Sequence, residues 1–435
     1  MSRFLVVGGG IAGLVTARRL ALAGASVVLF EASDRLGGTV SSHTVGGIVL
    51  DSGAESFATR RGTVAALARE LGLGDDIVEP TPDGAWLQRP DGAVKLPATS
   101  LLGIPAFPIA ADVIAAVGTR TALRAYLDRL LPAPVGGKAT SLGEFVRIRM
   151  GAGMVEKLVA PVTNGVHSAH PDDLELDRVA PGLRKATRRE SSLARGVLDL
   201  RASAPAGSAV AGIRGGVHRL ASELVADLER LGVDLRLGER VERVTVGSVT
   251  TRGETLGGTV VVAAPGIAGA SATRGSGESV RVVIATLVVD DARLDAAPRG
   301  SGVLVAAGVR GIRAKALTHS TAKWKWLAEA AGGKHVLRLS YEPVNAIELR
   351  MTARQDAATI LGIDLPASSV LDFDRVEWSR PAPQPEAVQG VTLVGEATSG
   401  TGLANVIAQA TAAAEQLLAD APGTPTIDPE PPLEP

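Results

Sequence analysis

The chain has 435 residues, of which 46% are hydrophobic, and a formal net charge of −1. This composition allows two domains with sizeable cores and excludes a disordered chain. The near-neutral charge offers no general affinity for nucleic acid or an anionic membrane. The absence of cysteine excludes disulfides, thiolate chemistry and cysteine-ligated metal.

Signals for metal binding and for targeting are weak. The six histidines are scattered, and the nearest pair, His167 and His170, lies in a proline-containing segment that favours an ordinary loop, so we expect no metal site. The first apolar strand begins next to Met1, which leaves no room for a signal peptide. No apolar run reaches the ~18 residues of a membrane span. We therefore expect a cytoplasmic, soluble protein; a peripheral membrane contact and the oligomeric state stay open.

The N-terminal stretch carries the strongest motif. Phe4–Val7 predicts a buried strand, and the glycines of a G-x-G-x-x-G pattern follow it at Gly8, Gly10 and Gly13. Such glycines allow a tight turn, close approach of backbone amides to a pyrophosphate and close packing of the next helix. Glycine-rich turns without a ligand are common, so this motif alone is weak evidence for a dinucleotide site.

The residues after the first helix strengthen the prediction. Val27–Phe30 predicts a second strand that ends on Glu31, where this fold places a carboxylate for a ribose diol. The segment Arg35–Thr39 (RLGGT) resembles the second glycine signature of flavin-dependent amine oxidases and their relatives. That resemblance implies FAD, because a plain NAD site has no need of the extra loop.

The remaining elements are taken in chain order. We expect a hairpin at Thr44–Asp51, an amphipathic helix at Thr63–Leu71 and a hairpin around Asp91-Gly92 within Ala85–Pro97. A proline-broken helical pattern from Leu101 to Leu131 is followed by a turn or linker at Pro132–Gly137. Further helices are expected at Leu142–Val159 and Arg178–Leu200, the latter interrupted at Pro181-Gly182. Ala202–Ala211 reads as small and flexible. Further strands are expected at Val233–Leu237, Arg240–Val246, Thr259–Pro265, Val280–Asp290, Gly302–Val309, Val336–Tyr341 and Val391–Val394, and helices from Gly215 to Leu231, at Ala346–Leu361 and at Ala404–Leu418.

The all-apolar strands predict the domain organisation. The first strand, TVVVAAP at 259–265 and VTLV at 391–394 fit one parallel sheet. We therefore expect an α/β plus α+β protein, with a discontinuous Rossmann-like FAD-binding domain and an antiparallel-sheet substrate domain that carries a helical insert. The predicted bounds are 1–84, 202–270 and 386–421 for the FAD-binding domain, 85–201 for the hairpin and helical insert, 271–385 for the substrate sheet, and 422–435 for a disordered tail.

Separated segments from Arg3 to about Leu418 resemble the bacterial FAD-dependent protoporphyrinogen and coproporphyrinogen oxidases of the flavin amine oxidase superfamily. They are VVGGGIAGL with EASDRLGGT, LDSGAESF, APVTNGVHSAHPDDLELDRVAP, IRGGVHRL, HSTAKWKW and GEATSGTGLANVIAQA. The first and last are shared across the superfamily and specify FAD. The middle segments are closer to the porphyrinogen oxidases.

The resemblance implies a set of FAD contacts, each of which also has an ordinary structural interpretation. The diphosphate is expected at the first glycine turn, the adenosine ribose at the acid, adenine at the backbone of Val241, the isoalloxazine near Trp378, and its pyrimidine end at the start of the last helix. The expected cofactor residues are Gly8, Gly9, Gly10, Ile11, Ala12, Gly13, Glu31, Ala32, Arg35, Gly37, Gly38, Thr39, Gly53, Ala54, Glu55, Ser56, Val241, Trp378, Gly395, Glu396, Leu403, Ala404 and Asn405.

The chemistry that the resemblance implies needs few catalytic side chains. A porphyrinogen loses six electrons and six protons in three steps, with hydride passing to the flavin and O2 as the expected acceptor. No acid–base pair is expected; the protein supplies an apolar slot and cations for the propionates of a tetrapyrrole. Candidate cations are Arg60 and Arg61, and a cluster that also reads as a solvated helix face: Arg184, Lys185, Arg188 and Arg189.

Two departures from the family pattern leave the identity of the substrate open. WSRPAPQPEAVQGVTLVGEA lacks the tyrosine and the helix that usually follow the tryptophan in this family, and the chain has only two tyrosines. We expect a porphyrinogen, with coproporphyrinogen III ahead of protoporphyrinogen IX. The alternatives are an amine or polyene, for which Lys315, Lys323 or Lys325 would position a water, and a non-catalytic porphyrin binder. FAD is expected to be non-covalent, since no cysteine is available for a thioether.

Overall fold

The computed structural model describes residues 3–59, 61–167, 169–202, 210–267, 280–344, 347–380 and 388–420. A five-stranded sheet collects strands from distant parts of the chain, and every pairing in it is parallel. Its order is β12 (Asp234–Arg236), β2 (Ser26–Phe30), β1 (Arg3–Val7), β16 (Thr259–Val262) and β22 (Val391–Leu393). The apolar strands β1 and β16 lie side by side in it, so three separate parts of the chain contribute strands to one parallel sheet.

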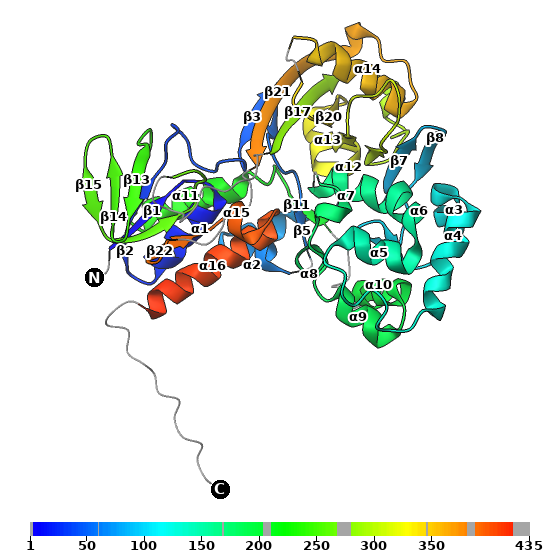
Figure 1. Ribbon diagram of the computed structural model, residues 1–435. Helices are drawn as coiled ribbons and strands as arrows, with labels where there is room; N and C mark the ends of the chain where they lie inside the picture. The colour runs from blue at the N-terminus through cyan, green and yellow to red at the C-terminus, as the bar shows by residue number, and fades with distance from the viewer. Residues whose placement is uncertain are drawn as a thin grey trace.

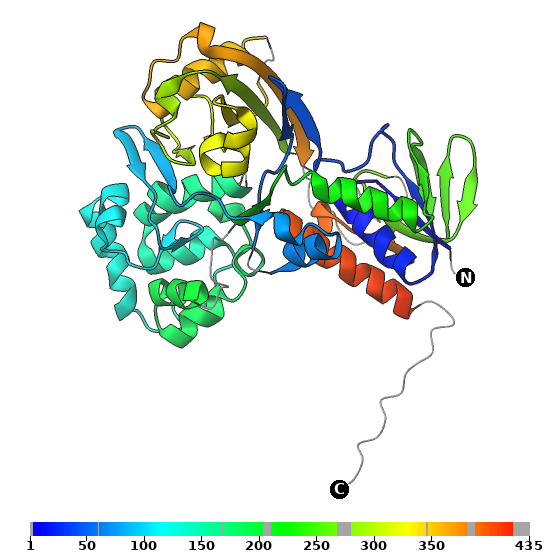
Figure 2. The ribbon, with the colours of Figure 1, turned by 180° about the vertical axis from the view of Figure 1, so that it is seen from behind.

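Helices cover one face of this sheet, and a small sheet covers the other. Figure 2 shows α11 (Arg219–Arg230), α1 (Ile11–Leu22) and α16 (Leu403–Ala419) side by side on the near face. Their apolar residues, with those of α2 (Thr63–Glu70), form one buried core with β1 and β2. On the other face, residues of β13 (Val241–Thr245), β14 (Ser248–Thr251) and β15 (Thr255–Gly257) pack on Leu5, Val28 and Phe30.

A seven-stranded sheet forms the second unit. Its order is β21 (Val370–Arg380), β17 (Val280–Val289), β20 (His335–Tyr341), β19 (Ala316–His319), β18 (Gly302–Val305), β7 (Ala85–Arg89) and β8 (Gly92–Lys95). All neighbours are antiparallel except β18 and β7. Helix α14 (Leu349–Leu361) packs on one face through a buried apolar cluster, which leaves the opposite face for other contacts.

The helical insert lies beside this sheet (Figure 1). Its elements are α3 (Ala111–Val117), α4 (Thr119–Tyr126), η2 (Leu127–Leu130), α5 (Leu142–Met150), α6 (Ala152–Met154), η3 (Val155–Val159), α7 (Ala160–His167), η4 (Pro171–Asp173), α8 (Leu176–Val179), α9 (Leu183–Glu190) and α10 (Leu193–Ala202). The shorter elements elsewhere are β3 (Ser42–Val45), β4 (Ile48–Asp51), β5 (Phe57–Ala58), η1 (Gly74–Asp76), β6 (Ile77–Val78), β9 (Ser100–Leu101), β10 (Ile104–Pro105), β11 (Val210–Ile213), η5 (Ala292–Leu294), α12 (Ser320–Lys323), α13 (Lys325–Ala331), η6 (Ala367–Ser369) and α15 (Glu396–Ser399).

The insert is more broken than the sequence predicts. The expected helix Leu142–Val159 stops at Gly151, which has a φ of +93°. The expected helix Arg178–Leu200 has a second break at Ser191, whose φ is +53° and whose carbonyl accepts a hydrogen bond from the buried Arg149. In the described ranges, no helix combines the length and the apolar character needed to cross a bilayer.

Strands β11 and β21 have no counterpart among the predicted elements. Val210 and Ala211, expected in a flexible stretch, pair with β5, and residues 203–209 lie outside the described ranges. Strand β21 pairs along the whole of β17. The predicted start of α14 at Ala346 and the predicted tail at 422–435 also lie outside the described residues.

Candidate active site

The turn after β1 is shaped by glycines. Gly8 has a φ of +106°, and a Cβ there would lie 3.0 Å from Ala264 Cβ. A Cβ on Gly13 would lie 1.9 Å from the Gly8 carbonyl oxygen, so only glycine lets α1 sit this close to β1. At Gly10, the N-cap of α1, a Cβ would meet no atom within 4 Å, and no side chain caps this helix. The turn therefore leaves open space at an uncapped, positively polarised helix end.

Two more glycine loops converge on this turn. Gly37 donates its backbone N–H to the Gly9 carbonyl at 2.8 Å, and a Cβ on Gly38 would lie 3.2 Å from Gly10 Cα. Gly395, in the loop after β22, has a φ of +109°, and a Cβ there would be 3.4 Å from Ala12 Cβ. Three segments that are far apart in the sequence thus meet backbone to backbone around the start of α1.

Glu31 is held at the end of β2. One carboxylate oxygen accepts the Gly9 N–H at 2.8 Å, and the other accepts the Ser33 backbone N–H and hydroxyl, both at 2.8 Å. These bonds orient the carboxylate next to the glycine turn. Val241 lies at the start of β13, 6% exposed and packed in the core around Phe30.

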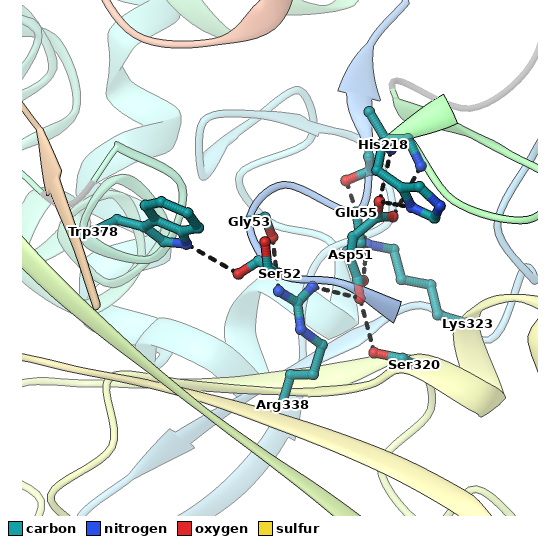
Figure 3. Close-up of polar contacts among 11 residues, drawn as sticks. Asp51, Ser52, Gly53, Glu55, His218, Ser320, Lys323, Arg338 and Trp378 are labelled. Carbon is teal, nitrogen blue, oxygen red and sulfur yellow. Dashed lines mark hydrogen bonds and ion pairs between the residues drawn. The ribbon is translucent and has the colours of Figure 1, made fainter. Parts of the chain in front are cut away.

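The loop after β4 brings Glu55 into an ionic cluster with the seven-stranded sheet. Its carboxylate accepts hydrogen bonds from Ser320 Oγ at 2.8 Å, Lys323 Nζ at 2.8 Å and Arg338 Nη1 at 3.0 Å (Figure 3). We call Glu55, Ser320, Lys323 and Arg338 the Glu55 cluster. Burial would raise the pKa of Glu55, but the charges of Lys323 and Arg338 and the hydrogen bonds outweigh it and lower the pKa to about 2. The carboxylate is therefore ionised and its charge is compensated.

Backbone carbonyls of the same loop fix two further side chains. Arg338 Nη2 donates to the Gly53 carbonyl at 2.7 Å, and Trp378 Nε1 donates to the Ser52 carbonyl at 3.0 Å (Figure 3). A Cβ on Gly53 would lie 2.1 Å from the Thr39 carbonyl oxygen, so glycine is required here. Residues 52–55 thus connect the glycine loops to β20 and β21.

Asp51 anchors the other side of this loop. Its carboxylate accepts the backbone N–H groups of Val217 at 2.9 Å and His218 at 2.8 Å, and His218 Nδ1 lies 2.9 Å from Oδ1 (Figure 3). Both donors belong to the turn that precedes α11. The carboxylate therefore stabilises the start of this helix and fixes the loop that leads to Glu55.

A row of small and apolar residues crosses the sheet on the face opposite α14. Registers between neighbouring strands align Val376 with Ile284, Ile284 with Ser340, Ser340 with Ala316, and Ala316 with Leu304. All five, which we call the central row, are partly exposed. Arg338 lies two residues along β20 from Ser340, on the same face as the row. The central row therefore lies next to the place where the loop of Gly53 and Glu55 meets the sheet.

The edges of this face are defined by other elements. Trp378 pairs with Val282, two residues along from the Val376 and Ile284 pair. At the opposite end of the row, a Cβ on Gly165 of α7 would lie 2.4 Å from Leu304 Cδ2. The central row is thus bordered by the insert at Leu304, by Trp378 near Val376 and by the Glu55 cluster on its long side. This arrangement can hold a flat apolar molecule against the loop.

Comparisons with known proteins agree with this geometry. The profile of the family described as flavin containing amine oxidoreductase matches residues 11–272. The coproporphyrinogen III oxidase of Mycobacterium tuberculosis is 30% identical over 405 residues, which cover 88% of this chain and 86% of that protein.

The chain belongs to the flavin containing amine oxidoreductase family. It is a flavin-dependent oxidoreductase. The chloroplastic protoporphyrinogen oxidase 1 of Arabidopsis thaliana is 26% identical over 261 residues, 55% of this chain and 46% of that protein. The crystal structure of a candidate protoporphyrinogen oxidase from Exiguobacterium sp. 255-15 superposes with a TM-score of 0.80 at 21% identity and covers 97% of this chain and 99% of the other. The predicted fold class is confirmed by this similarity.

The residues at the glycine loops fit the dinucleotide part of a flavin cofactor. The space in front of Gly10 and the uncapped start of α1 suit a diphosphate, and Glu31 lies beside them. The predicted cofactor residues fall into seven places in the structure: the turn after β1 (Gly8 to Gly13), the end of β2 (Glu31, Ala32), the second glycine loop (Arg35, Gly37, Gly38, Thr39), the loop after β4 (Gly53 to Ser56), β13 (Val241), β21 (Trp378), and the segment from α15 to the start of α16 (Gly395, Glu396, Leu403, Ala404, Asn405).

The predicted cations that the structure describes line two cavities whose lining includes no residue of the central row. Arg60 is outside the described residues, and Arg61 is exposed in a cavity of about 320 Å³ beside Arg178 and Asn405. The cluster Arg184, Lys185, Arg188 and Arg189 lines a separate cavity of about 510 Å³ on α9. In Figures 1 and 2, α9 lies at the end of the insert that points away from β21.

Sequence reasoning missed several residues that connect the two sheets. Arg338 is not among the predicted site residues, and Ser320, Asp51 and His218 occur in the prediction only within motifs. A signal existed for Arg338, since it is a charged residue inside the apolar strand HVLRLSY. Of the three lysines considered, the structure places Lys323 in the Glu55 cluster, while Lys315 pairs with Glu342.

Proposed function

We propose that the chain is an FAD-dependent oxidase that aromatises a porphyrinogen, with coproporphyrinogen III as the preferred substrate. The observation that carries the proposal is the central row, a partly exposed apolar strip that reaches from Leu304 to the neighbourhood of Trp378. A macrocycle needs a flat apolar surface beside the flavin and few reactive side chains. The relative from Mycobacterium tuberculosis, similar over most of both chains, supports the same substrate.

The cofactor in this proposal is FAD, held without a covalent bond. The diphosphate binds at Gly8 to Gly13 and the second glycine loop, and the ribose at Glu31. Trp378, Gly53 and the start of α16 would hold the isoalloxazine. The chain has no cysteine for a thioether link. When bound, the flavin supplies a two-electron acceptor for hydride, and O2 is the proposed final oxidant.

The side chains orient the substrate and exclude water. The central row contacts the macrocycle, and Trp378 is held in one orientation by the Ser52 carbonyl. Three turnovers remove six electrons and six protons and, with O2 as acceptor, give three molecules of H2O2. The protons leave from substrate carbon and nitrogen and need no dedicated acid–base pair.

The Glu55 cluster counts against an amine substrate. Lys323, the only one of the three considered lysines in this cluster, donates to Glu55 at 2.8 Å and has a side chain that is 15% exposed. A lysine so paired is poorly suited to position a water. Glu55 is ionised but accepts three hydrogen bonds, so it is a weak proton acceptor for an ammonium substrate.

The test is direct. The purified protein should show a flavin spectrum, release FAD on denaturation, and produce porphyrin fluorescence from coproporphyrinogen III in air faster than a heat-denatured control. Protoporphyrinogen IX and a diamine are assayed in parallel, the amine by H2O2 release. A flavoprotein that oxidises the amine, or that shows no porphyrinogen rate above the control, would overturn the proposal.

A further inference from the structure

The short helix α15 connects the two parts of the proposed flavin site. At its start, a Cβ on Gly395 would lie 3.4 Å from Ala12 Cβ of α1, so this end adjoins the glycine turn. Its other end leads through Gly402 to the first residues of α16, Leu403 to Asn405. The position of α15 therefore affects how the glycine turn and the start of α16 lie relative to each other.

Gln409 of α16 holds α15 from within the same unit. Its Oε1 accepts the Gly395 N–H at 2.9 Å, and its Nε2 donates to Thr398 Oγ1 and to the Leu393 carbonyl, both at 3.0 Å. These bonds do not involve the backbone carbonyls of the last turn of α15, and a helix cannot satisfy its own last carbonyls. The C-terminal end of α15 therefore needs a partner from elsewhere.

The helical insert supplies this partner through Arg178. Arg178 Nη2 donates to the Thr398 carbonyl at 3.2 Å, although 220 positions separate the two residues. The guanidinium lies against Gly400, which has a φ of +79° and where a Cβ would lie 2.7 Å from Arg178 Nε. Arginine side chains commonly bind the last carbonyls of a helix. Arg178 thus caps α15 from a different unit of the protein.

Arg178 is carried by a well-packed part of the insert. It belongs to α8, on the side of the insert that faces α15 (Figure 1). Leu176 of the same helix is buried in the apolar core of the insert, and its backbone N–H donates to the Thr140 carbonyl at 3.0 Å. The insert also borders the central row through Gly165 of α7. One unit therefore contacts both the proposed substrate face and the segment at the proposed flavin site.

We propose that Arg178 is a positioning residue for the flavin: it holds α15 through the Thr398 carbonyl and thereby aligns the start of α16 with the isoalloxazine. This inference rests on the placement of the cofactor proposed above. Without the guanidinium, the end of α15 faces only the cavity of about 320 Å³ that Arg178 and Ser399 line. The segment then gains conformational freedom, which flavin binding has to remove at a cost in affinity.

The experiment compares Arg178→Met with Arg124→Met, a matched control within the insert. Arg124 of α4 makes the same kind of contact at the end of α5: its Nη1 donates to the Arg149 carbonyl at 3.0 Å, and a Cβ on Gly151 would lie 2.9 Å from Arg124 Cγ. Arg178→Lys keeps a charged donor and tests for rescue. For each holoprotein, FAD release on dilution gives the Kd, and visible circular dichroism reports the surroundings of the flavin ring. Urea unfolding without flavin gives the stability.

Arg178→Met should raise the Kd for FAD by about fivefold, equivalent to roughly 1 kcal/mol, and change the visible circular dichroism of the bound flavin. Arg178→Lys should lie between the wild type and Arg178→Met. Arg124→Met should lower the urea midpoint by a similar amount but leave the Kd and the spectrum as in the wild type.

An unchanged Kd in Arg178→Met, or an equal rise in Arg124→Met, would overturn the inference. These measurements use no porphyrinogen. A protein that shows the expected effects on FAD but oxidises no porphyrinogen would therefore disprove the proposed function alone.

Discussion

The cofactor end and the substrate end of the site are held together by different kinds of contact. At the cofactor end, three glycine loops meet backbone to backbone, and a Cβ on Gly13 would lie 1.9 Å from a carbonyl oxygen. At the substrate end, long side chains bridge the units, as in the Arg338 to Glu55 bond between residues 283 positions apart in the sequence. The first region depends on the absence of side chains, and the second on the balance of buried charges.

This difference sets what each end tolerates. A larger residue in a glycine turn destabilises the protein by steric overlap, and no neighbour can move away when the overlapping atom belongs to the backbone. Removing one partner from an ionic cluster destabilises the protein because the remaining charges stay buried without compensation. The cofactor end should therefore be sensitive to added volume, and the substrate end to altered charge.

The largest effect should come from added volume at the cofactor end. Gly13→Ala should lower the free energy of unfolding by about 5 kcal/mol and abolish flavin binding, because the added methyl overlaps the Gly8 carbonyl. Gly10→Ala should leave the stability of the flavin-free protein within about 1 kcal/mol but weaken flavin binding, because its methyl enters the open space at the start of α1. Urea unfolding of flavin-free protein and flavin titration measure the two quantities.

Gly253→Ala serves as the control for these variants, since a Cβ there meets no atom within 4 Å and the position lies in a distant hairpin. Parallel losses of stability in Gly10→Ala and Gly13→Ala would show that the space before α1 is not reserved for a ligand.

The same difference explains how much the sequence predicts. The glycine turn, both flanking strands and Glu31 are recognisable because their spacing is local, and Gly8 and Gly13 each have a steric reason. The parallel sheet follows from the apolar strands β1 and β16. By contrast, the Glu55 cluster depends on which residue of β20 faces a loop almost 300 positions earlier, and periodicity alone does not specify that pairing.

Strand β21 is a second element that the local sequence does not predict. Its sequence VLDFDRVEWSR contains acids that disfavour strands, yet Asp372 accepts the Gly46 N–H at 2.6 Å and Asp374 lies within hydrogen-bonding distance of His43. These partners come from β3 and the turn that follows it. Tertiary contacts therefore outweigh propensity here, as they do at the Ser191 break in the insert.

The charge balance at the substrate end is tested by Arg338→Met. This variant keeps the volume of the side chain but leaves Glu55 with one cation and frees the Gly53 carbonyl. We expect a loss of about 4 kcal/mol in the free energy of unfolding. Arg293→Met, which removes a half-exposed arginine from η5 after β17, should change it by less than about 1 kcal/mol. Similar losses in both would mean that the buried cluster contributes no more than a surface pair.

The depressed pKa of Glu55 predicts a pH dependence. Because the pKa falls from 4.5 to about 2 on folding, the unfolded state binds more protons between these values, and stability rises with pH in this window. The contribution is complete above about pH 4.5 and is lost as the pH falls towards 2. Between pH 7 and pH 3, wild type should lose about 2 kcal/mol more than Glu55→Gln in urea unfolding. Equal losses would contradict an ionised, charge-stabilised Glu55.

The smallest effect concerns a single hydrogen bond at the boundary of the two regions. Trp378→Phe keeps most of the aromatic volume but removes the N–H that donates to the Ser52 carbonyl at 3.0 Å, and should cost about 1 kcal/mol. Trp326→Phe is the matched control, because its indole nitrogen is buried with no hydrogen-bond partner among the described residues; losing that N–H should be neutral or slightly stabilising. Urea unfolding of both variants gives the difference. If Trp378→Phe is no less stable than Trp326→Phe, the carbonyl does not hold the indole, and Trp378 would owe its orientation to packing on β17 alone.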